Sequence, residues 1–167
     1  ALLPIGTYRI RETKAPKGFW INGEVKVVKL KPVKDENGKL SISEYEVPSF
    51  DEKEQTVRVR VRKFGESENK ALAGAHFELK RIADADGKPL KQEETRVEKI
   101  VTDEDGVAEK GGLLPGIYEL KETKSPDGYA LSKEAYRIEA MGAEGDTIVT
   151  RDDGEKEFLY ESQIGNA

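Results

Sequence analysis

"LLPGIYELKETKSPDGYAL", residues 113–131, is the most informative stretch of the sequence because a near copy of it occurs earlier in the chain. Its near copy is "LLPIGTYRIRETKAPKGFWI", residues 2–21. From the tyrosine onward the copies stay in register at an offset of 110 residues, which pairs Glu12 with Glu122, Pro16 with Pro126 and Gly18 with Gly128. This period is far longer than a solenoid unit but suits one small domain. We therefore expect tandem domains of one kind.

The repeat also predicts where the domains begin and end. One period counted back from residue 57 runs past residue 1, so the chain is expected to start inside its first module. Residues 1–56 are then the C-terminal half of one domain, and residues 57–167 are a complete second domain. The polar, charged "FDEKEQ" at residues 50–55 is the predicted junction. On this interpretation the chain is part of a longer array.

Composition narrows the class of protein. The 167 residues carry 28 Lys and Arg against 33 Asp and Glu, a formal net charge of -5, which argues against nucleic acid as a partner. Only 36% of the residues are hydrophobic and cysteine is absent, so we expect a thin core without disulfides. No apolar run reaches the roughly 18–20 residues that span a bilayer, which predicts no membrane insertion in this stretch.

Short segments that alternate apolar with polar residues run through the chain, as is typical of half-buried antiparallel strands. They are 56–63, 76–82, 96–102, 117–123, 134–140, 146–150 and 157–164. Asp-Gly and Pro-Asp-Gly turns between several of them supply the positive-φ positions of hairpins. The N-terminal part is similar, with "EVKVVKLKP" followed by a turn at "ENG". The sequence predicts an all-β chain folded as sandwiches of short strands.

One residue of the repeated stretch does not suit its place. In "IYELKET", residues 117–123, Tyr118 and Leu120 lie on one face of the expected strand, and Glu122 has the same parity. Glu12 repeats this arrangement in the first copy. A carboxylate turned toward a core is costly unless it has a partner or stays protonated. A cost that occurs twice indicates a function.

Two further strands also place a polar residue on their apolar face. In "TVRVRVRK", residues 56–63, valines alternate with arginines, and Lys63 follows on the valine side. In the last strand the parity of Phe158 and Ile164 marks the inner face, and Asn166 continues it. One Lys, one Glu and one Asn are thereby turned toward one interior. The arginines of the first strand are expected to form a solvated face that discourages edge pairing.

These three side chains are the reactants for an isopeptide bond. Desolvation in an apolar core lowers the pKa of a lysine toward its neutral, nucleophilic form. A buried Glu can hold a proton, polarise the Asn carbonyl and pass protons to the departing ammonia. Close packing supplies the orientation. The reaction would occur once in each molecule, so we expect self-modification without catalytic turnover.

The segment "YELKETKSPDGY", residues 118–129, resembles the E-box of Gram-positive pilins and surface adhesins, whose pattern is Tyr-x-Leu-x-Glu-Thr-x-Ala-Pro-x-Gly-Tyr. It has a serine where the pattern has alanine. "YRIRETKAPKGF", residues 8–19, is similar but ends in Phe, and "KALAGAHFELK", residues 70–80, is similar to the family's Leu-x-Gly-Ala-x-Phe-x-Leu stretch. The resemblance is to collagen-adhesin B-type domains, and it covers residues 57–167 and, through the repeat, 1–56.

This resemblance implies a fold and a set of roles. The fold is a prealbumin-like, Ig-like β-sandwich, the nucleophile is Lys63 in the first strand, and the catalytic carboxyl is the E-box Glu122. The acceptor belongs in the last strand, where Asn166 is the best match. Glu161 and Asp152 are weaker alternatives because their parity or placement is worse. No cofactor and no metal are expected.

The first copy contains counterparts of two of these residues. Glu12 fits the E-box, and Asp51 continues the face of Tyr45, Val47 and Ser49 as the expected acceptor. No lysine strand precedes Glu12 in this sequence. No bond is therefore expected to form within the first module.

The resemblance implies a structural stalk or spacer module of an extracellular cell-wall or cell-surface protein, a pilin or adhesin of a Gram-positive bacterium. Its partners would be neighbouring domains of the same surface protein. The alternative is an adhesin domain that binds a host extracellular-matrix protein or glycan through a long, aromatic-rich loop. The connections are short and turn-like apart from the polar "ADADGKPLKQEET", residues 83–95, so we rank this alternative second. An enzyme would need a second carboxylate or a histidine beside Glu122, and the alternation along the strands turns no such residue toward the same interior.

Overall fold

The computed structural model of the chain describes residues 3–42 and 48–167. The chain divides into two compact units, residues 1–54 and 55–167, and the division falls inside the predicted junction at residues 50–55. Both units consist of strands and turns, and the described residues contain one helix, a single 3₁₀ turn. The all-β prediction is confirmed. None of the described residues belongs to a helix long and apolar enough to cross a bilayer.

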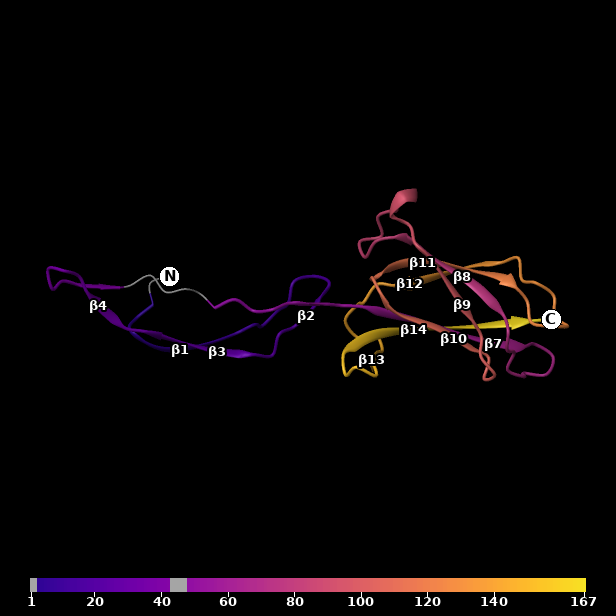
Figure 1. Ribbon diagram of the computed structural model, residues 1–167, viewed down its shortest axis with the longest axis horizontal. Helices are drawn as coiled ribbons and strands as arrows, with labels where there is room; N and C mark the ends of the chain where they lie inside the picture. The colour runs from indigo at the N-terminus through magenta and orange to yellow at the C-terminus, as the bar shows by residue number, and fades with distance from the viewer. Residues whose placement is uncertain (1–2, 43–47) are drawn as a thin grey trace. The chain divides into compact units, whose positions relative to one another are not determined.

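The second unit is a sandwich of two four-stranded sheets, which confirms the predicted architecture (Figure 1). Its elements are β7 (Val57–Gly65), β8 (His76–Ala83), η1 (Gln92–Glu94), β9 (Val97–Val101), β10 (Val107–Leu113), β11 (Gly116–Lys124), β12 (Ala135–Ala140), β13 (Ile148–Thr150) and β14 (Lys156–Asn166). One sheet has the strand order β10-β7-β14-β13 and the other β12-β11-β8-β9. Neighbouring strands are antiparallel except β7 and β14, the first and last, which run parallel side by side.

Alternation along the strands builds the core between the two sheets. Val57, Val59 and Val61 of β7 are fully buried, and so are Leu79 of β8 and Leu120 of β11. Burying one side chain of this size stabilises the fold by about 1.5–3 kcal/mol relative to leaving it in water. The core is formed by such side chains from the facing sides of the two sheets.

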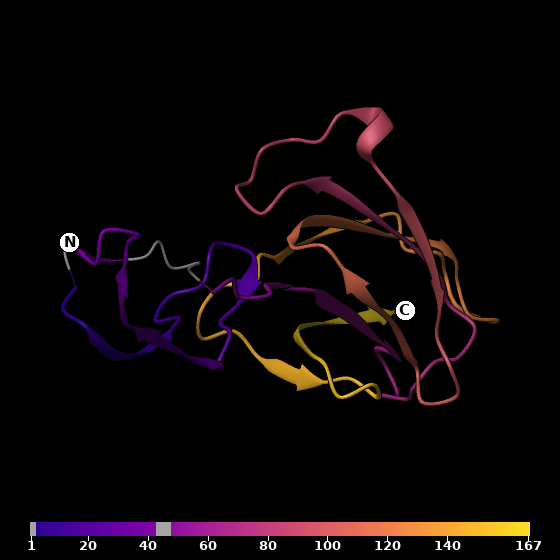
Figure 2. The same ribbon diagram turned by 60° about the vertical axis from the view of Figure 1, so that its left-hand side comes forward.

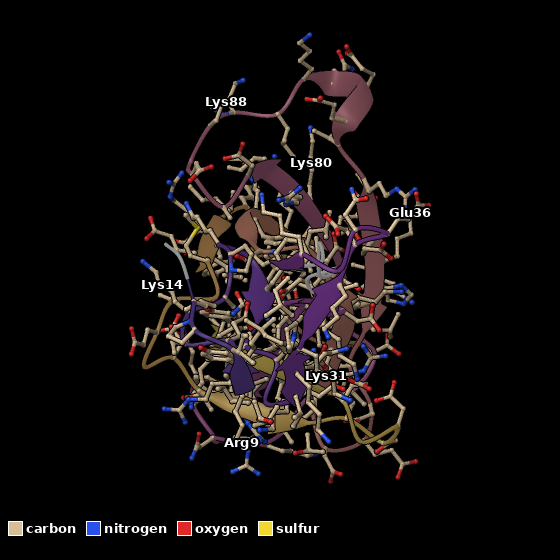
Figure 3. The ribbon with its side chains drawn as sticks, turned by 90° about the vertical axis from the view of Figure 1, so that its left-hand side faces the viewer. Arg9, Lys14, Lys31, Glu36, Lys80 and Lys88 are labelled. Carbon is tan, nitrogen blue, oxygen red and sulfur yellow. The ribbon has the colours of Figure 1, made fainter. Side chains whose placement is uncertain are left out.

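The loop between β8 and β9 carries η1 and stands out from the two sheets in Figure 2. Figure 3 shows Lys88, on this loop, pointing away from the sandwich. The loop begins with an acidic turn that its own backbone stabilises, since Asp84 Oδ1 accepts hydrogen bonds from the amides of Asp86 and Lys88 at 2.9 Å. The hydrogen bond from Lys88 is the main cause of the lowered pKa of Asp84. These contacts support the predicted hairpin turn.

The alternation pattern does not predict β10, which pairs with β7 from Val107 to Leu113. Its segment "VAEKGGL" has two glycines in place of alternating apolar residues, and the ladder shifts register between Lys110 and Leu113. A Cβ on Gly111 would lie 2.5 Å from the guanidinium of Arg58. The glycine therefore makes room for an arginine of the neighbouring strand.

The described residues of the first unit form short paired strands and contribute no fully buried side chain. Its strands are β1 (Gly6–Arg11), β2 (Phe19–Trp20), β3 (Val25–Leu30), β4 (Pro32–Lys34), β5 (Leu40–Ile42) and β6 (Lys53–Glu54). β1 pairs with β3, β2 with β6 and β4 with β5. Among its described side chains none is buried, and Tyr8 and Ile10 on the inner face of β1 are half-buried. Figure 3 shows Arg9, between these two, pointing away from the strand.

The sequence repeat is also a repeat of strand pairing. Gly6 lies opposite Leu30 in the β1–β3 ladder, and Gly116 lies opposite Ala140 in the β11–β12 ladder. Both partners therefore keep the offset of the sequence repeat. In the second unit β11 also pairs with β8, and no strand takes that place beside β1 within the described part of the first unit. The division into a half domain and a complete domain stays a prediction.

Candidate functional site

Lys63 lies near the end of β7 and continues the buried side of the strand. The alternation that buries the three valines turns the lysine side chain inward as well. Only 1% of Lys63 is exposed, and its Nζ lies 5.7 Å from the centre of the Phe77 ring on β8. Because a buried amine is costly without polar contacts, its neighbours decide what it can do.

Asn166 is the last residue of β14 and lies beside the lysine strand. The parallel ladder pairs Ile164 with Lys63 and Asn166 with Gly65. Asn166 is 4% exposed, and its backbone carbonyl accepts a hydrogen bond from the Glu66 amide at 2.9 Å. The end of β14 is therefore held in the ladder, with the side-chain amide in the interior.

Glu122 comes from the opposite sheet. It lies on β11, on the same face as Tyr118 and Leu120, which are 3% and 0% exposed. Glu122 itself is 6% exposed. Its Oε2 accepts a hydrogen bond from the backbone amide of Ser132 at 2.7 Å. This carboxyl therefore lies inside the sandwich, as its position in the alternating strand predicts.

The three side chains meet between the two sheets. Lys63 Nζ lies 3.2 Å from Glu122 Oε1 and donates a hydrogen bond to Asn166 Oδ1. Asn166 Nδ2 lies 3.2 Å from both carboxylate oxygens of Glu122. Each side chain is therefore in polar contact with the other two. The side chains of Lys63 and Glu122 are fully buried.

Burial lowers the pKa of the Lys63 amine from its usual value, because the ammonium loses its hydration in the interior. The hydrogen bond and charge of Glu122 and the charge of Glu66 act in the opposite direction. The net shift is downward, so the neutral amine is more accessible than it is in water. The neutral amine is the nucleophilic form of lysine.

The arrangement brings together an amine, a carboxamide and a carboxyl, the groups that the sequence predicts as nucleophile, acyl acceptor and proton carrier. The two alternative acceptors lie elsewhere: Glu161 is on the outer face of β14, where its Oε1 is 2.9 Å from Arg62 Nε, and Asp152 is exposed in the turn before β14. Within the described residues neither contacts Lys63. Of the acceptors considered from the sequence, the structure brings only Asn166 to the amine.

The first copy of the repeated stretch has the same local hydrogen bonds as the second. The Asn22 amide donates to Glu12 Oε2 at 2.6 Å, as the Ser132 amide does to Glu122. In each copy the tyrosine hydroxyl donates to the carbonyl four residues earlier, at 2.6 Å in both. The local geometry around the carboxyl is therefore a property of the repeated segment itself.

Strand register gives the residue of the first copy that corresponds in position to Asn166. β2 pairs with β6 so that Trp20 lies opposite Lys53. In the second unit the counterpart of that tryptophan, Ala130, donates its amide to the Ala167 carbonyl. Lys53 therefore corresponds to Ala167, and the residue before Lys53 corresponds to Asn166.

That residue is Glu52, whereas the sequence indicates Asp51. The pKa of Glu52 is raised by partial loss of hydration and by a hydrogen bond and like charge from Glu12, so these two carboxyls are neighbours. Asp51 offers its backbone carbonyl to an asparagine side chain at 2.9 Å. Of the face predicted to lead to Asp51, Tyr45 and Val47 lie outside the described residues. The register of the β2–β6 ladder therefore indicates a residue one position later in the chain than the parity count does.

A buried carboxylate that sequence reasoning missed lies at the start of β14. Glu157 is fully buried, and its Oε1 is 2.6 Å from Arg58 Nε. Its Oε2 accepts a hydrogen bond from the Gly112 amide at 3.1 Å. Parity puts Glu157 on the outer face, opposite to Phe158, and the neighbouring strands then cover it. The sequence holds no signal for that covering.

The arginine face of β7 is partly exposed, as predicted, but its residues are paired. The prediction that this face discourages edge pairing is wrong, because β7 lies between β10 and β14 and is not an edge strand. Arg58 and Arg60 both contact Glu109 of β10, at 2.8 and 2.7 Å, and Arg62 contacts Glu161 of β14 at 2.9 Å. Burial opposes ionisation of Glu109, but the hydrogen bonds and charges of the two arginines outweigh it and lower the pKa of this carboxyl. Strand neighbours, which the sequence does not reveal, supply the partners.

Residues 57–156 match the SpaA prealbumin-like fold domain family. No curated protein sequence matches the chain. The solved structure of the Bacillus anthracis TIE protein aligns with 98% of this chain at 24% identity and a TM-score of 0.65. The alignment covers 25% of that protein, so the chain spans about a quarter of its length.

Two solved pilins are also similar. The group B streptococcus pilus 2b backbone protein aligns with 93% of this chain and 51% of its own, at 18% identity and a TM-score of 0.50. Domains D2 and D3 of the Corynebacterium diphtheriae major pilin SpaD align with 66% of this chain and 46% of theirs, at 31% identity and a TM-score of 0.46. The first of these and the TIE protein share the fold of this chain.

Proposed function

Since the chain belongs to the family of SpaA prealbumin-like fold domains, we propose that it is a structural stalk module of a Gram-positive surface protein, locked by a covalent bond between Lys63 and Asn166. The module acts outside the cell, in the cell wall or on its surface. Its partners are the neighbouring domains of the same protein. The solved pilus backbone protein of the same fold supports this assignment.

One observation carries the proposal: an amine, a carboxyl and an amide from three separate strands are in mutual contact in a dry interior. Burying a lysine and a glutamate costs several kcal/mol per ion unless their pairing compensates. Hydrophobic residues of similar volume would stabilise a core at least as well. A chemical role accounts for the presence of these groups.

The proposed reaction begins when the Lys63 ammonium gives a proton to the Glu122 carboxylate, 3.2 Å away. The neutral Nζ attacks Asn166 Cγ, and the Cγ–Nδ2 bond breaks after the Nζ–Cγ bond has formed. Glu122 donates its proton to Nδ2, which leaves as ammonia, and takes up the excess proton of Nζ. An amide joins the two side chains, and one ammonia molecule is released. The amine is consumed, so the reaction occurs once.

The bond lies on the mechanical path through the unit. The chain enters at β7 and leaves at the end of β14, and these strands are parallel neighbours. With Lys63 and Asn166 joined, tension passes along residues 57–63 and through the bond, and residues 64–165 carry no load. A β-strand is already extended at about 3.3 Å per residue. The unit would therefore resist force without unfolding.

We also propose that residues 1–56 belong to a second module of the same kind and that residues 57–167 form a complete one. The shared register of the two ladders and the shared hydrogen bonds of Glu12 and Glu122 support this. In that module Glu12 takes the part of the catalytic carboxyl. Glu52 occupies the place of the acceptor.

Mass spectrometry of the purified chain tests the proposed bond. The intact mass should be lower than the sequence mass by one ammonia, and protease digestion should give a branched peptide joining the segments of Lys63 and Asn166. Cyclisation of an asparagine also releases ammonia, so the branched peptide is the decisive product. Lys63→Met should abolish it, and Lys80→Met, a lysine of β8 outside the site, should not. A linear Lys63 peptide from the wild-type chain would refute the proposal.

A further inference from the structure

We propose that the acceptor site is specific for a carboxamide, and that the backbone carbonyl of Ala130 is the positioning group responsible. This inference rests on the proposed bond and adds a residue that the E-box and strand-parity arguments do not identify. Ala130 lies after the E-box and before β12. Its carbonyl accepts a hydrogen bond from Asn166 Nδ2 at 2.9 Å.

The hydrogen-bond partners of Asn166 fit an amide in one orientation. Its Oδ1 accepts from Lys63 Nζ, and its Nδ2 faces two kinds of acceptor, the Glu122 carboxylate at 3.2 Å and the Ala130 carbonyl at 2.9 Å. An Asn amide has two N–H donors and one carbonyl acceptor, so every group is matched. The reverse orientation would set the NH₂ against the ammonium and the oxygen against two acceptors.

The Pro-x-Gly end of the repeated stretch holds the Ala130 carbonyl in place. The Tyr129 amide donates to the Pro126 carbonyl at 3.2 Å, and Gly128 between them has φ 87°, a left-handed conformation that favours glycine. The Ala130 amide is bonded to the Ala167 carbonyl, beside the acceptor. The turn therefore fixes the carbonyl against the last strand, which gives the Pro-x-Gly sequence a role in the reaction.

An aspartate in place of Asn166 would not suit this site. Its ionised carboxylate has no hydrogen to offer Ala130 and would face the Glu122 carboxylate as well. An unmatched buried polar group costs about 1–3 kcal/mol. Oxygen would also replace nitrogen as the leaving atom, so water and not ammonia would be released.

The proton count gives the two acceptors different pH dependences. With Asn166, the ionised Lys63 and Glu122 sum to zero charge, and the reaction needs no proton from solution. In the Asn166→Asp variant the site holds one positive and two negative groups, and the one proton of Lys63 can convert either the new carboxylate or Glu122 to its acid, but not both. The site must therefore take up a proton before the amine can attack a carboxylic acid with a protonated Glu122 beside it. Glu66, which also acts on Lys63, adds a further negative charge nearby. The reaction of the variant should therefore accelerate as pH falls from neutral.

Asn166→Asp tests the inference in the full-length chain. Pulsed cell-free synthesis, sampled by intact and peptide mass spectrometry, gives the rate of branched-peptide formation for each chain. We expect the Asn166→Asp chain to react about 10- to 100-fold more slowly at neutral pH, and to react faster at lower pH while the wild-type rate stays flat. Equal rates at neutral pH, or a flat profile for the variant, would overturn the inference. Those results would leave the wild-type bond, and so the proposed function, standing.

A second variant strains the turn that holds the carbonyl and leaves the acceptor unchanged. Gly128→Ala puts a side chain into the left-handed conformation, where the added Cβ meets no atom within 4 Å, so the substitution strains the backbone of the turn without a steric clash. We expect it to slow the wild-type reaction and to narrow the difference between the Asn and Asp acceptors. Gly18→Ala is the matched control, since that glycine has φ 85° and equally open surroundings in the other copy. If the two variants slow bond formation equally, or neither does, the carbonyl is not the positioning group.

Discussion

Replacing Glu122 by glutamine is expected to preserve the sandwich and to stop formation of the cross-link. Glutamine has nearly the same size as glutamate, and it can still accept the hydrogen bond that the Ser132 amide donates to Glu122 Oε2 at 2.7 Å. It cannot accept and return protons between Lys63 Nζ and the departing ammonia. The variant should therefore keep its full sequence mass, whereas the wild-type chain should lack one ammonia.

The loss of stability can be estimated from the span of the bond. Lys63 and Asn166 are 103 positions apart, and a cross-link that closes a loop of about 100 residues stabilises a fold by about 4.7 kcal/mol through the entropy of the unfolded chain. For a domain of this size, 1 kcal/mol corresponds to roughly 4 °C in melting temperature. The Glu122→Gln chain should therefore melt roughly 15–20 °C below the wild type.

Lys63→Met separates the cross-link from the electrostatics of the site. It removes the amine and its charge, so it should also abolish the bond. The double variant Lys63→Met, Glu122→Gln should be only slightly less stable than the less stable of the two single variants. Non-additivity of this kind is expected for residues that act together. Differential scanning calorimetry and intact mass on all four chains complete the cycle. Two results would refute the reasoning: a branched peptide in Glu122→Gln, or its absence with an unchanged melting temperature.

Other contacts in the chain give three further predictions. In an Asn166→Ala chain the Lys63 amine stays free, and burial lowers its pKa, so between that pKa and the usual value the unfolded state binds more protons and the free energy of unfolding should rise with pH. Urea denaturation across the alkaline range should show this rise relative to the wild type, in which Lys63 is expected to be part of an amide that cannot titrate. Parallel plots of unfolding free energy against pH for the two chains would contradict the prediction. Arg58→Met should lower the free energy of unfolding by about 3–5 kcal/mol, because it leaves the buried Glu157 carboxylate without its cation. Arg62→Met, at a pair whose side chains are 48% and 32% exposed, should lower it by under about 1 kcal/mol. Equal losses of stability in denaturant titrations would refute the distinction. Limited proteolysis should cut the first unit before residues 55–167, since none of its described side chains is buried, and earlier cleavage in the second unit would contradict this.

The strand pattern predicted the second unit well because burial in a sandwich alternates along each strand. The alternation in residues 56–63 was enough to turn Lys63 inward, and the parity of Tyr118 and Leu120 was enough to do the same for Glu122. The repeated stretch identified the domain type without any knowledge of strand order. In the second unit β10 was not predicted by the pattern, because its glycines interrupt the alternation where they make room for Arg58.

The first-copy acceptor shows the limit of parity counting. A count along one strand says which face a residue is on, but it does not say which residue of a neighbouring strand lies opposite. The pairing of Trp20 with Lys53 is the basis on which we propose Glu52 for the acceptor place, where the parity count predicts Asp51. The same limit hid the covering of Glu157 by Arg58 and the amide of Gly112.

The all-β class, the repeat, and the inward direction of an amine, a carboxyl and an amide could be predicted from residue order alone, because they follow from local alternation and similarity. Three features required the folded arrangement: the first and last strands of the second unit are parallel neighbours, the arginine face is paired, and the Ala130 carbonyl faces Asn166. Those features join residues far apart in the chain, and the contacts between them form only when the two sheets close over a common core.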